Sequence, residues 1–442
     1  MAVLQITPQT GPLQGTVTVP GDKSLSHRAV LLGALATGES TVRGWLPAGD
    51  TRATLAAMQA MGVEIAVEET QSAAWDLRIS GRGLRGLRPS AAPLDCQNAG
   101  TCLRLLAGIM AGQDFPSTLT GSEQLRRRPM NRIVMPLTEM GARIDADGGT
   151  APLAISPAAL QGISYRMPVA SAQVKSAILL AGLYARGQTR VYQPGPARDH
   201  TERLLTAMGI PLAVDGNWIT LPAPPDGGWT LEPLDLAIPG DISSAAFPLV
   251  AAMIVPHSRV KLAGIGLNQT RTGLLALLAQ MGASYTVSNR NTTGGEPAGD
   301  IGIAFEELQA TAAAGEVVVR AIDELPIWAV AATQAMGPSH LRDAAELRVK
   351  EVDRIAVLAA ELQKLGVPVD ERDDGLTIAG PVRPAGGNVS SHGDHRLGMA
   401  LAVAGLVARA PTRIHEAEAI ADSFPGFVET MQALGAHMEW LP

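Results

Sequence analysis

Six apolar segments with helical spacing end in Met-Gly or Leu-Gly, and each then passes into a short run with strand-like character. In one of them, Ile355, Leu358, Leu362 and Leu365 follow each other at three and four residues, the spacing of a buried helix face. A glycine at such a place adopts the left-handed backbone that ends a helix. The glycines recur every 68 to 84 residues, at Gly62, Gly141, Gly209, Gly282, Gly366 and Gly435. This period predicts six copies of one folding unit.

Each copy has a second landmark upstream, an Asp, Asn or Ser that precedes a new apolar helix pattern. Such side chains accept hydrogen bonds from the first free backbone N–H groups of a helix. They lie 38 to 43 residues before the glycine of their copy, at Asp22, Asn98, Ser171, Asp241, Asp323 and Asp394. One copy therefore consists of a helix, a short strand, a second helix, the glycine and a further strand.

One short motif occurs twice and predicts the domain organisation. Val19-Pro20-Gly21-Asp22 recurs as Ile238-Pro239-Gly240-Asp241, with three copies of the unit between the two motifs and three after the second. We expect the chain to pass between two domains at both places, with a hinge near 20–21 and 239–240. One domain would comprise residues 21–239 and the other residues 1–20 and 240–442. A cleft between two such domains is a natural site for small molecules.

Composition narrows the class of protein. The net charge of −7 argues against general nucleic-acid binding. The longest apolar runs, such as Ala245–Val255, fall short of the roughly 18 residues needed to span a membrane. No Lys or Arg precedes Lys23, so we expect no signal peptide. The two cysteines, Cys96 and Cys102, form no zinc pattern with histidine. We therefore expect a cytoplasmic enzyme without a metal that binds neither nucleic acid nor a membrane.

Polar and charged residues that could bind ligands or take part in a reaction gather at the predicted helix starts. At these places free N–H groups and the helix dipole favour anions. In the first half these are Lys23, Ser24 and Arg28 after Asp22, Gly100 after Asn98, and Gln173 after Ser171. A run of three arginines, Arg126 to Arg128, lies in a loop, where solvated charge is the usual explanation.

The second half adds carboxylates to the cations. Lys350, Glu351 and Arg354 have spacings of three and four residues, which predicts that they project together from the first turn of a helix. Asp323 opens one predicted helix, and Arg396 lies in the first turn of another. Many cations suggest ligands with several negative charges, and the carboxylates beside them suggest proton transfer.

Several of these segments together resemble the 5-enolpyruvylshikimate-3-phosphate synthase family. They are Pro20-Gly21-Asp22-Lys23-Ser24-Leu25-Ser26-His27-Arg28, Asn98-Ala99-Gly100-Thr101, Arg128-Pro129, Ser171-Ala172-Gln173, Arg348-Val349-Lys350-Glu351-Val352-Asp353-Arg354 and Asp394-His395-Arg396. The match covers the whole chain in order. The resemblance implies an α/β fold, the two-domain inside-out α/β barrel of enolpyruvyl transferases, with six βαβαββ-type units and three per domain.

The resemblance also implies the reaction. Such an enzyme transfers the enolpyruvyl group of phosphoenolpyruvate to the 5-hydroxyl of shikimate 3-phosphate through a tetrahedral intermediate, in the shikimate pathway to aromatic amino acids. It would work as a cytoplasmic monomer without a cofactor. Gly100 further implies sensitivity to glyphosate, because an alanine there would crowd the inhibitor.

The family's functional residues carry over by motif position. Those implied to be catalytic are Asp323, Glu351 and Lys23. Those implied to bind shikimate 3-phosphate are Lys23, Ser24, Arg28, Ser171, Ala172, Gln173, Arg198, Asp323 and Lys350. Those implied to bind phosphoenolpyruvate are Lys23, Gly100, Arg128, Gln173, Arg354 and Arg396. Ala172 departs from a second serine that some members have, so one hydroxyl contact to the phosphate would be missing.

Two alternatives stay open from the sequence. The first is the related enolpyruvyl transferase that acts on UDP-N-acetylglucosamine, which generally uses a cysteine on a mobile loop. The corresponding region, Gly121–Pro129, contains no cysteine. The second is a non-catalytic anion-binding protein on the same scaffold, which would not need Asp323 and Glu351 beside its cations.

Overall fold

The computed structural model describes residues 2–71 and 74–441, so the ends of the predicted second domain, Met1 and Pro442, lie outside the described residues. The chain divides into two compact units. Unit 1 contains residues 2–20, Pro239–Asn291 and 297–441, and unit 2 contains Gly21–Ile238 and Thr292–Glu296. No helix in this part of the chain combines the length and the apolar character that crossing a membrane requires.

One folding unit in unit 2 shows the repeated pattern. Its elements are β10 (Ser164–Arg166), α6 (Ala172–Gly182), β11 (Thr189–Tyr192), α7 (His200–Ala207), β12 (Ala213–Asp215) and β13 (Trp218–Leu221). The four strands form one sheet in the order β10-β11-β13-β12. The first two strands are parallel, and the other neighbours are antiparallel. The pattern is therefore βαβαββ.

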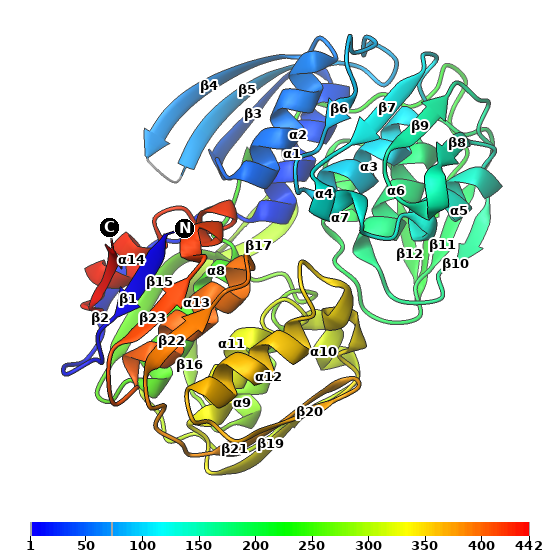
Figure 1. Ribbon diagram of the computed structural model, residues 1–442. Coiled ribbons are helices and arrows are strands. Elements are labelled where there is room, and N and C mark those ends of the chain that lie inside the picture. The colour runs from blue at the N-terminus through cyan, green and yellow to red at the C-terminus, as the bar shows by residue number, and fades with distance from the viewer. Residues whose placement is uncertain (1, 72–73, 442) are drawn as a thin grey trace. The chain divides into compact units, whose positions relative to one another are not determined.

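The other two folding units of unit 2 have the same strand order. One consists of β6 (Leu94–Asp95), α3 (Gly100–Met110), β7 (Ser117–Thr120), α5 (Asn131–Glu139), β8 (Arg143–Ala146) and β9 (Leu153–Ser156), with the short α4 (Glu123–Arg126) and η1 (Asp147–Gly149). The other consists of β14 (Asp235–Ala237), α1 (Lys23–Leu35), β3 (Thr37–Trp45), α2 (Gly49–Ala60), β4 (Glu64–Gln71) and β5 (Ala74–Arg82). Figure 1 shows this last sheet beside α1 and α2.

Unit 1 repeats the pattern three more times. Its first folding unit is β2 (Gln14–Val17), α8 (Ile242–Ile254), β15 (Arg259–Gly266), α9 (Gly273–Gln280), β16 (Tyr285–Thr293) and β17 (Glu296–Ala304). The second is β18 (Ala312–Ala313), α11 (Leu325–Thr333), β19 (Gly337–Leu341), α12 (Arg354–Lys364), β20 (Val369–Arg372) and β21 (Gly375–Gly380), with α10 (Glu316–Arg320) and η2 (Ala345–Val349). The third is β22 (Gly387–Ser390), α13 (His395–Leu406), β23 (Thr412–His415), α14 (Phe427–Ala433), β24 (Met438–Leu441) and β1 (Val3–Ile6), with η3 (Ala417–Asp422). The prediction of an α/β fold with six βαβαββ-type copies is confirmed.

Two strands belong to a sheet other than the one their place in the chain suggests. β2 precedes α1 in sequence but pairs in parallel with β15, so that Val17 lies opposite Leu262. β14 precedes α8 but pairs in parallel with β3, so that Leu236 lies opposite Val42. The chain changes units directly after each strand, between Pro20 and Gly21 and between Ile238 and Pro239. Unit 1 thus obtains β1 and β2 from the distant N-terminal part of the chain, and unit 2 obtains β14 from a part far from β3.

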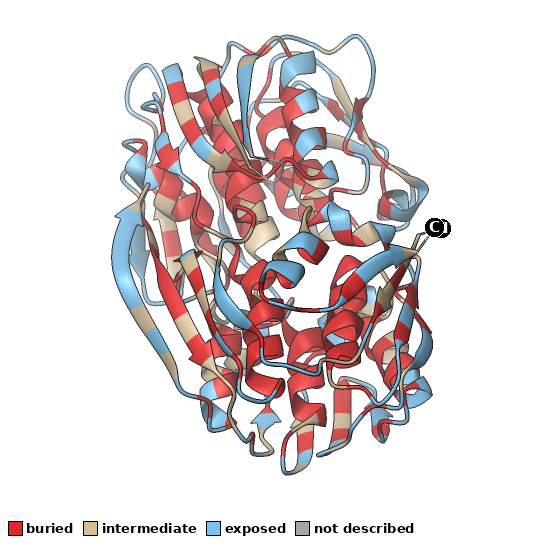
Figure 2. Ribbon diagram, turned by 90° about the vertical axis from the view of Figure 1, so that its left-hand side faces the viewer, coloured by how far each residue is buried: buried red, intermediate tan, exposed pale blue. Residues whose placement is uncertain are grey.

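The core of each unit is built from helices, and the sheets form its outer layer. Every residue of α8, α11 and α13 is buried, and these helices pack against one another. A helix that is apolar all round must be surrounded by other elements. The strands instead alternate, as in β9, where Leu153 and Ile155 are buried and their neighbours are exposed. Figure 2 shows buried residues along the helices and mixed exposure on the strands. This is the inside-out arrangement that the resemblance implies.

The predicted helix ends are confirmed in all six copies. The six glycines follow the last residues of α2, α5, α7, α9, α12 and α14, and their φ angles lie between 78° and 97°. Four of the predicted caps also accept hydrogen bonds from the first turn of a helix: Asp22, Ser171, Asp241 and Asp394.

Two predicted helix starts are wrong. The N-cap of α3 is Ala99, and the side chain of Asn98 bonds instead to Ser122 and Gln124. The N-cap of α11 is Glu324, which makes no side-chain capping bond. The Asp323 side chain faces cations instead. Cap residues and functional residues are drawn from the same types, so the pattern does not distinguish them.

A substitution at Gly366 can show whether the glycines that end the helices are needed for their backbone angle alone. Its φ is 78°, and a Cβ there would meet only Ala385 Cβ at 3.9 Å. We expect Gly366→Ala to lower the free energy of unfolding by about 1 kcal/mol through backbone strain, as measured by urea denaturation. Gly11→Ala is the control, because Gly11 has no such φ and no atom within 4 Å of the added Cβ. Equal effects of the two changes would contradict the prediction.

Candidate active site

One group of polar side chains in unit 2 surrounds the first turns of α1. Arg28 donates from Nε to Thr201 Oγ1 at 2.7 Å and from Nη2 to Ser176 Oγ at 3.0 Å. Arg198 donates from Nη1 to Ser24 Oγ at 3.2 Å. The structure therefore places Ser24, Arg28 and Arg198 together, although 170 residues separate Arg28 from Arg198.

A second group lies at the start of α3. Arg104 donates from Nη1 to Gln173 Oε1 at 2.6 Å, and Gln173 donates from Nε2 to Thr101 Oγ1 at 2.9 Å. A Cβ on Gly100 would lie 2.9 Å from Arg104 Nη1 and 3.2 Å from Arg128 Nη1. Two guanidinium groups thus flank the first residue of a buried helix, which is a favourable place for an anion.

Helix α6 connects the two groups. Gln173 reaches towards α3, and Ser176 reaches Arg28 on α1. The two residues are three apart, so they share one face of α6. Ser171 caps this helix, with its Oγ accepting from Val174 N at 3.4 Å, and Ala172 is its first residue. All the predicted residues of unit 2 except Lys23 thus lie at α3, at α6 or in the group around Arg28.

The charges of this region are mainly positive. Lys23 Nζ lies 3.0 Å from Asp50 Oδ2, with both side chains about one-fifth exposed. Burial lowers the pKa of Arg28 to about 10, and the neighbouring Arg198 acts in the same direction, while Glu202 opposes them. Arg28 still carries its proton at neutral pH. A region with this excess of cations is suited to a phosphorylated ligand.

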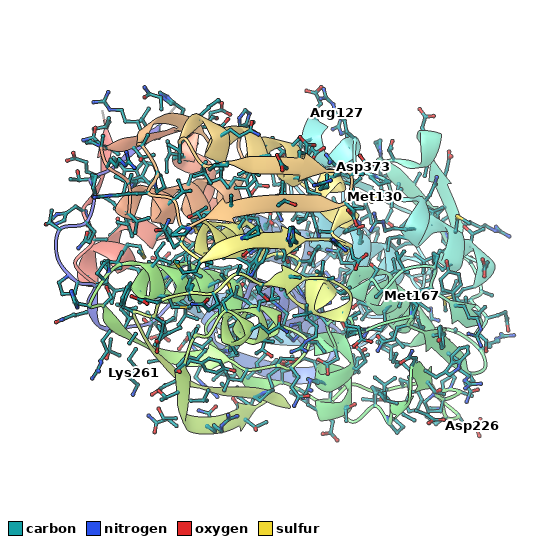
Figure 3. All side chains as sticks on the ribbon, turned by 90° about the horizontal axis from the view of Figure 1, so that it is seen from below. Arg127, Met130, Met167, Asp226, Lys261 and Asp373 are labelled. Atoms are coloured by element: carbon teal, nitrogen blue, oxygen red, sulfur yellow. The ribbon has the colours of Figure 1, made fainter. Side chains whose placement is uncertain are left out.

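The three consecutive arginines, Arg126 to Arg128, differ in their exposure to solvent. Arg126 and Arg127 are exposed; Arg127 pairs with Glu123, and Figure 3 shows its side chain extending away from the ribbon. Arg128 is half-buried and turns towards Gly100. Solvated charge therefore explains the first two arginines and not the third.

In unit 1 the predicted residues converge on the guanidinium of Arg354, which is buried. Arg354 donates from Nε to Asp394 Oδ2 at 2.7 Å and from Nη2 to Glu351 Oε2 at 2.6 Å. Its Nη1 lies 3.5 Å from Asp323 Oδ1. Three carboxylates from different segments therefore share one cation.

Two further cations complete this network around Asp323. Lys350 Nζ lies 3.8 Å from Asp323 Oδ1, and Arg396 Nη2 lies 3.7 Å from Asp323 Oδ2. Arg396 also donates from Nη1 to the Asp323 carbonyl at 3.1 Å. The five residues predicted for this half of the chain, Asp323, Lys350, Glu351, Arg354 and Arg396, are therefore brought together.

Two cations of the network, Arg354 and Lys350, respond differently to their surroundings. Burial opposes the charge of Arg354, but Asp394, Glu351 and Asp323 outweigh it, and the pKa lies above the usual arginine value. Burial lowers the pKa of Lys350, and Asp323 compensates only in part. Arg354 is thus a permanent charge, whereas Lys350 gives up its proton more readily than an ordinary lysine.

The reason predicted for this convergence is partly wrong. Helix α12 begins only at Arg354, with Asp353 as its N-cap accepting from Ala356 N. Lys350 and Glu351 precede the helix in extended or irregular backbone, so helical spacing does not bring them together. They meet Arg354 because the loop after η2 turns back onto the helix start.

Arg104 and Asp394 contact predicted site residues, although the sequence patterns do not place their side chains in the site. Arg104 lies one helical turn after Gly100, a spacing that indicates a shared face of α3. Asp394 was assigned only as a cap; one carboxylate oxygen does cap α13, while the other holds Arg354.

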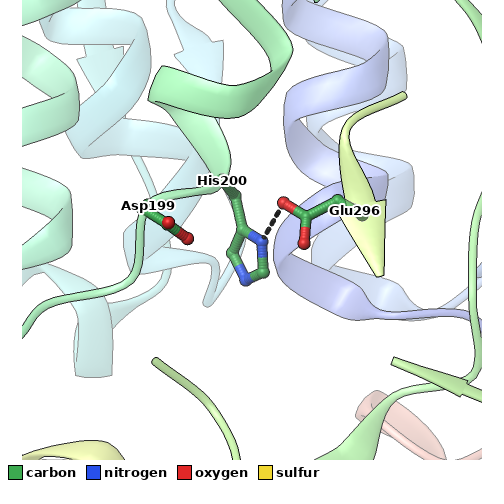
Figure 4. A group of neighbouring side chains, drawn as sticks. All are labelled: Asp199, His200 and Glu296. Carbon is green, nitrogen blue, oxygen red and sulfur yellow. Dashed lines mark hydrogen bonds and ion pairs between the residues drawn. The ribbon is translucent and has the colours of Figure 1, made fainter. Parts of the chain in front are cut away.

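One group in the described part of the chain has the chemistry of metal ligands. It comprises Asp199, His200 and Glu296, whose candidate ligand atoms lie within 4.8 Å of one another (Figure 4). Asp199 Oδ2 accepts from Arg203 Nε at 2.8 Å, and His200 Nδ1 lies 2.7 Å from Glu296 Oε1. Protein groups therefore already engage these atoms.

His27, in the segment Pro20–Arg28, is a buried histidine beside the cations of α1. Its Nδ1 lies 2.6 Å from Thr54 Oγ1. Burial lowers its pKa from 6.5 to about 3; Asp50 opposes this shift, while Lys23 and Arg28 add to it. The imidazole is therefore neutral in the folded protein at neutral pH.

The chain as a whole is similar to known proteins. Residues 7–431 match the family model described as EPSP synthase (3-phosphoshikimate 1-carboxyvinyltransferase). A 3-phosphoshikimate 1-carboxyvinyltransferase from Acidithiobacillus ferrooxidans is 50% identical over 427 residues, which cover 97% of this chain and 96% of that protein. One from Shouchella clausii is 47% identical over 424 residues, with 96% of each chain covered.

Solved structures agree. An EPSP synthase from Acinetobacter baumannii is 43% identical and superimposes with a TM-score of 0.89 over 100% of both chains. The enolpyruvyl transferase NikO from Streptomyces tendae is only 18% identical, with a TM-score of 0.80 over 100% of this chain and 99% of that one. The second likeness shows the fold alone.

The buried neutral His27 predicts a loss of stability in acid. Its folded pKa is depressed, so the unfolded chain binds one more proton between pH 6.5 and about 3. Stability from this group is complete above pH 6.5 and is lost as the pH falls towards 3. We expect His27→Gln to reduce the loss of unfolding free energy between pH 7 and pH 5 by about 2 kcal/mol. Urea denaturation at both pH values measures this, and an unchanged loss in the variant would contradict it.

Proposed function

The chain belongs to the EPSP synthase family, and from this premise we propose that it transfers the enolpyruvyl group of phosphoenolpyruvate to the 5-hydroxyl of shikimate 3-phosphate and releases inorganic phosphate. The observation that carries the proposal is the network around Arg354, in which Asp323 and Glu351 accompany three cations. Binding of two anions gains nothing from carboxylates beside them. Carboxylates can, however, accept and donate protons during a reaction.

Shikimate 3-phosphate is assigned mainly to unit 2. Ser24, Arg28 and Arg198 form a connected set of donors, and Ser171, Ala172 and Gln173 add the start of α6. A hydroxyl, two guanidinium groups and a helix N-terminus together match a phosphate. Lys23 and Lys350 are assigned to contact both substrates or their junction.

Phosphoenolpyruvate is assigned to the remaining cations. Arg128 and the backbone at Gly100 would bind it in unit 2, with Gln173 beside them, and Arg354 and Arg396 in unit 1. Arg104 supports this assignment because it flanks Gly100 on the same side as Arg128. Two polyanionic substrates repel each other, and fixed cations offset that repulsion better than water does.

The carboxylates are assigned to the two proton transfers. Asp323 accepts the proton of the 5-hydroxyl while that oxygen bonds to the central carbon of phosphoenolpyruvate. Glu351 protonates the methylene carbon, which gives a tetrahedral ketal. Glu351 then removes a proton from the methyl group, the C–O bond to phosphate breaks, and the enol ether is restored. Lys23 shares the acid–base work.

We also propose that the chain works as a monomer in the cytoplasm and that glyphosate inhibits it. Its two units would move about a hinge near residues 20–21 and 239–240. The two cysteines, Cys96 and Cys102, are free and buried, which suits a reducing compartment. Glyphosate is an anion of similar size to phosphoenolpyruvate, and the unsubstituted Gly100 leaves room beside the two arginines.

Phosphate release tests the proposed function. The purified protein should release one phosphate for each enolpyruvyl group transferred, and only with both substrates present. Glyphosate should compete with phosphoenolpyruvate in the same assay. A protein that binds shikimate 3-phosphate in calorimetry but releases no phosphate would be an anion-binding protein, and activity on UDP-N-acetylglucosamine instead would support the related transferase.

The role of Glu351 predicts a selective loss of turnover. We expect Glu351→Gln to lower kcat by about 10²- to 10⁴-fold, because the amide cannot carry the proton, while the affinity for shikimate 3-phosphate changes by less than about threefold. Steady-state kinetics and calorimetry measure the two quantities. Glu307→Gln, an exposed glutamate of the same unit, is the matched control. Full turnover in Glu351→Gln would exclude the residue from proton transfer.

A further inference from the structure

The hairpin formed by β16 and β17 is divided between the two units. Its tip, Thr292–Glu296, belongs to unit 2, whereas the chain on both sides of it belongs to unit 1. Two glycines turn the chain at this tip, Gly294 with φ 53° and Gly295 with φ 79°. No pattern in the sequence predicts this assignment, because the contacts of the tip are with residues more than 50 positions away.

The tip is held by contacts on three sides. Thr293 Oγ1 accepts from Ala237 N at 3.0 Å, and the Gly295 carbonyl accepts from Arg203 Nη1 at 2.9 Å. A Cβ on Gly294 would lie 2.6 Å from Leu236 Cδ1, so the backbone packs directly on β14. The tip is therefore built into unit 2.

The last residue of the tip makes the most buried of these contacts. Glu296 Oε1 lies 2.7 Å from His200 Nδ1, and each side chain is only 2% exposed. An ionised carboxylate can only accept, so Nδ1 donates. His200 Nε2 is buried and makes no hydrogen bond to the described residues. The bond to Glu296, drawn in Figure 4, is thus the polar contact that orients the imidazole.

His200 lies in the chain between two residues of the candidate site, Arg198 and Thr201. It is the first residue of α7, two positions after Arg198 and one before Thr201. Arg198 bonds to Ser24, and Thr201 bonds to both Arg28 and Ser176. A displacement of His200 would therefore move an arginine on one side and the support of another arginine on the other.

We propose that Glu296 and His200 are positioning residues for shikimate 3-phosphate. The hairpin tip delivers a buried carboxylate that fixes His200, and His200 fixes the segment from Arg198 to Thr201. The two arginines are thereby held in one arrangement before the substrate binds. This inference rests on the proposed function, because it names what Arg28 and Arg198 are arranged for.

Asp199, His200 and Glu296 have side chains that could bind a metal ion, but their contacts favour hydrogen bonding. Asp199 is paired with Arg203, and His200 is bonded directly to Glu296. A metal site would make activity depend on the ion, whereas a hydrogen-bonded anchor would not. Treatment of the wild-type protein with EDTA distinguishes them, and loss of activity that zinc restores would overturn the proposal.

Kinetics of Glu296 variants test the positioning role. We expect Glu296→Ala to raise KM for shikimate 3-phosphate about tenfold, with kcat and KM for phosphoenolpyruvate within about twofold of wild type. Glu296→Gln keeps an acceptor oxygen and should recover most of the loss, to within about threefold of wild type. Glu307→Ala is the control, because it removes an exposed glutamate just after β17 and should change neither KM.

Thr293→Val provides a milder variant in case Glu296→Ala does not fold. It removes only the acceptor for Ala237 N and should raise KM for shikimate 3-phosphate about threefold. A lower thermal midpoint with both KM values unchanged would show that the tip is merely structural. Equal increases in both KM values would also overturn the proposal. A wild-type protein that releases no phosphate would instead refute the proposed function.

Discussion

Burial of whole helices at the centre of each unit is the constraint on which the site depends. A helix such as α8 or α13 has no exposed face on which a polar side chain could act. Only its ends meet polar surroundings, and its N-terminus presents free N–H groups and a positive dipole. The residues assigned to the substrates lie at or just before these ends, among them Ser24, Gly100, Gln173 and Arg396. The architecture thus decides where chemistry can occur before any particular side chain is considered.

The two units differ in electrostatic character although they share a fold. Around α1, α3 and α6 cations prevail, with Asp50 as a counter-charge to Lys23. Around Arg354 the charges are nearly balanced, because Asp323, Glu351 and Asp394 face three cations. A cationic region suits the binding of phosphate, and a balanced one can hold groups that exchange protons. The internal repeat therefore carries two different charge patterns on one scaffold.

Much of the fold followed from local signals in the sequence. The six terminal glycines and four of the six caps are at the predicted places, since a helix end requires a specific backbone angle or hydrogen-bond acceptor within a few residues. Asn98 and Asp323 failed as caps because they bond to distant side chains, Gln124 and Arg354 among them. Local chemistry alone does not separate these two uses of a polar residue.

The sequence predicted which residues form the candidate site better than it predicted how the fold brings them together. The resemblance and the helix starts named the residues that gather around Arg354, but helical spacing gave the wrong reason for the position of Lys350 and Glu351. Arg104 and the Glu296–His200 pair were not assigned at all. The roles proposed for them rest on contacts between segments far apart in the chain, and a single sequence carries no direct record of such contacts.

The exchange of β2 and β14 has a consequence for how the protein is made. The three sheets of unit 2 draw only on strands between Thr37 and Ala237, so a growing chain can complete them early. β2 must wait for β15, and β1 must wait for β23 and β24 at the far end of the chain. At a ribosomal rate of about 5–20 residues per second, this delay is on the order of tens of seconds. Unit 1 therefore closes around the oldest part of the polypeptide only after synthesis is nearly finished. β2 remains an unpaired edge until β15 is made, and β1 remains one until β23 and β24 are made.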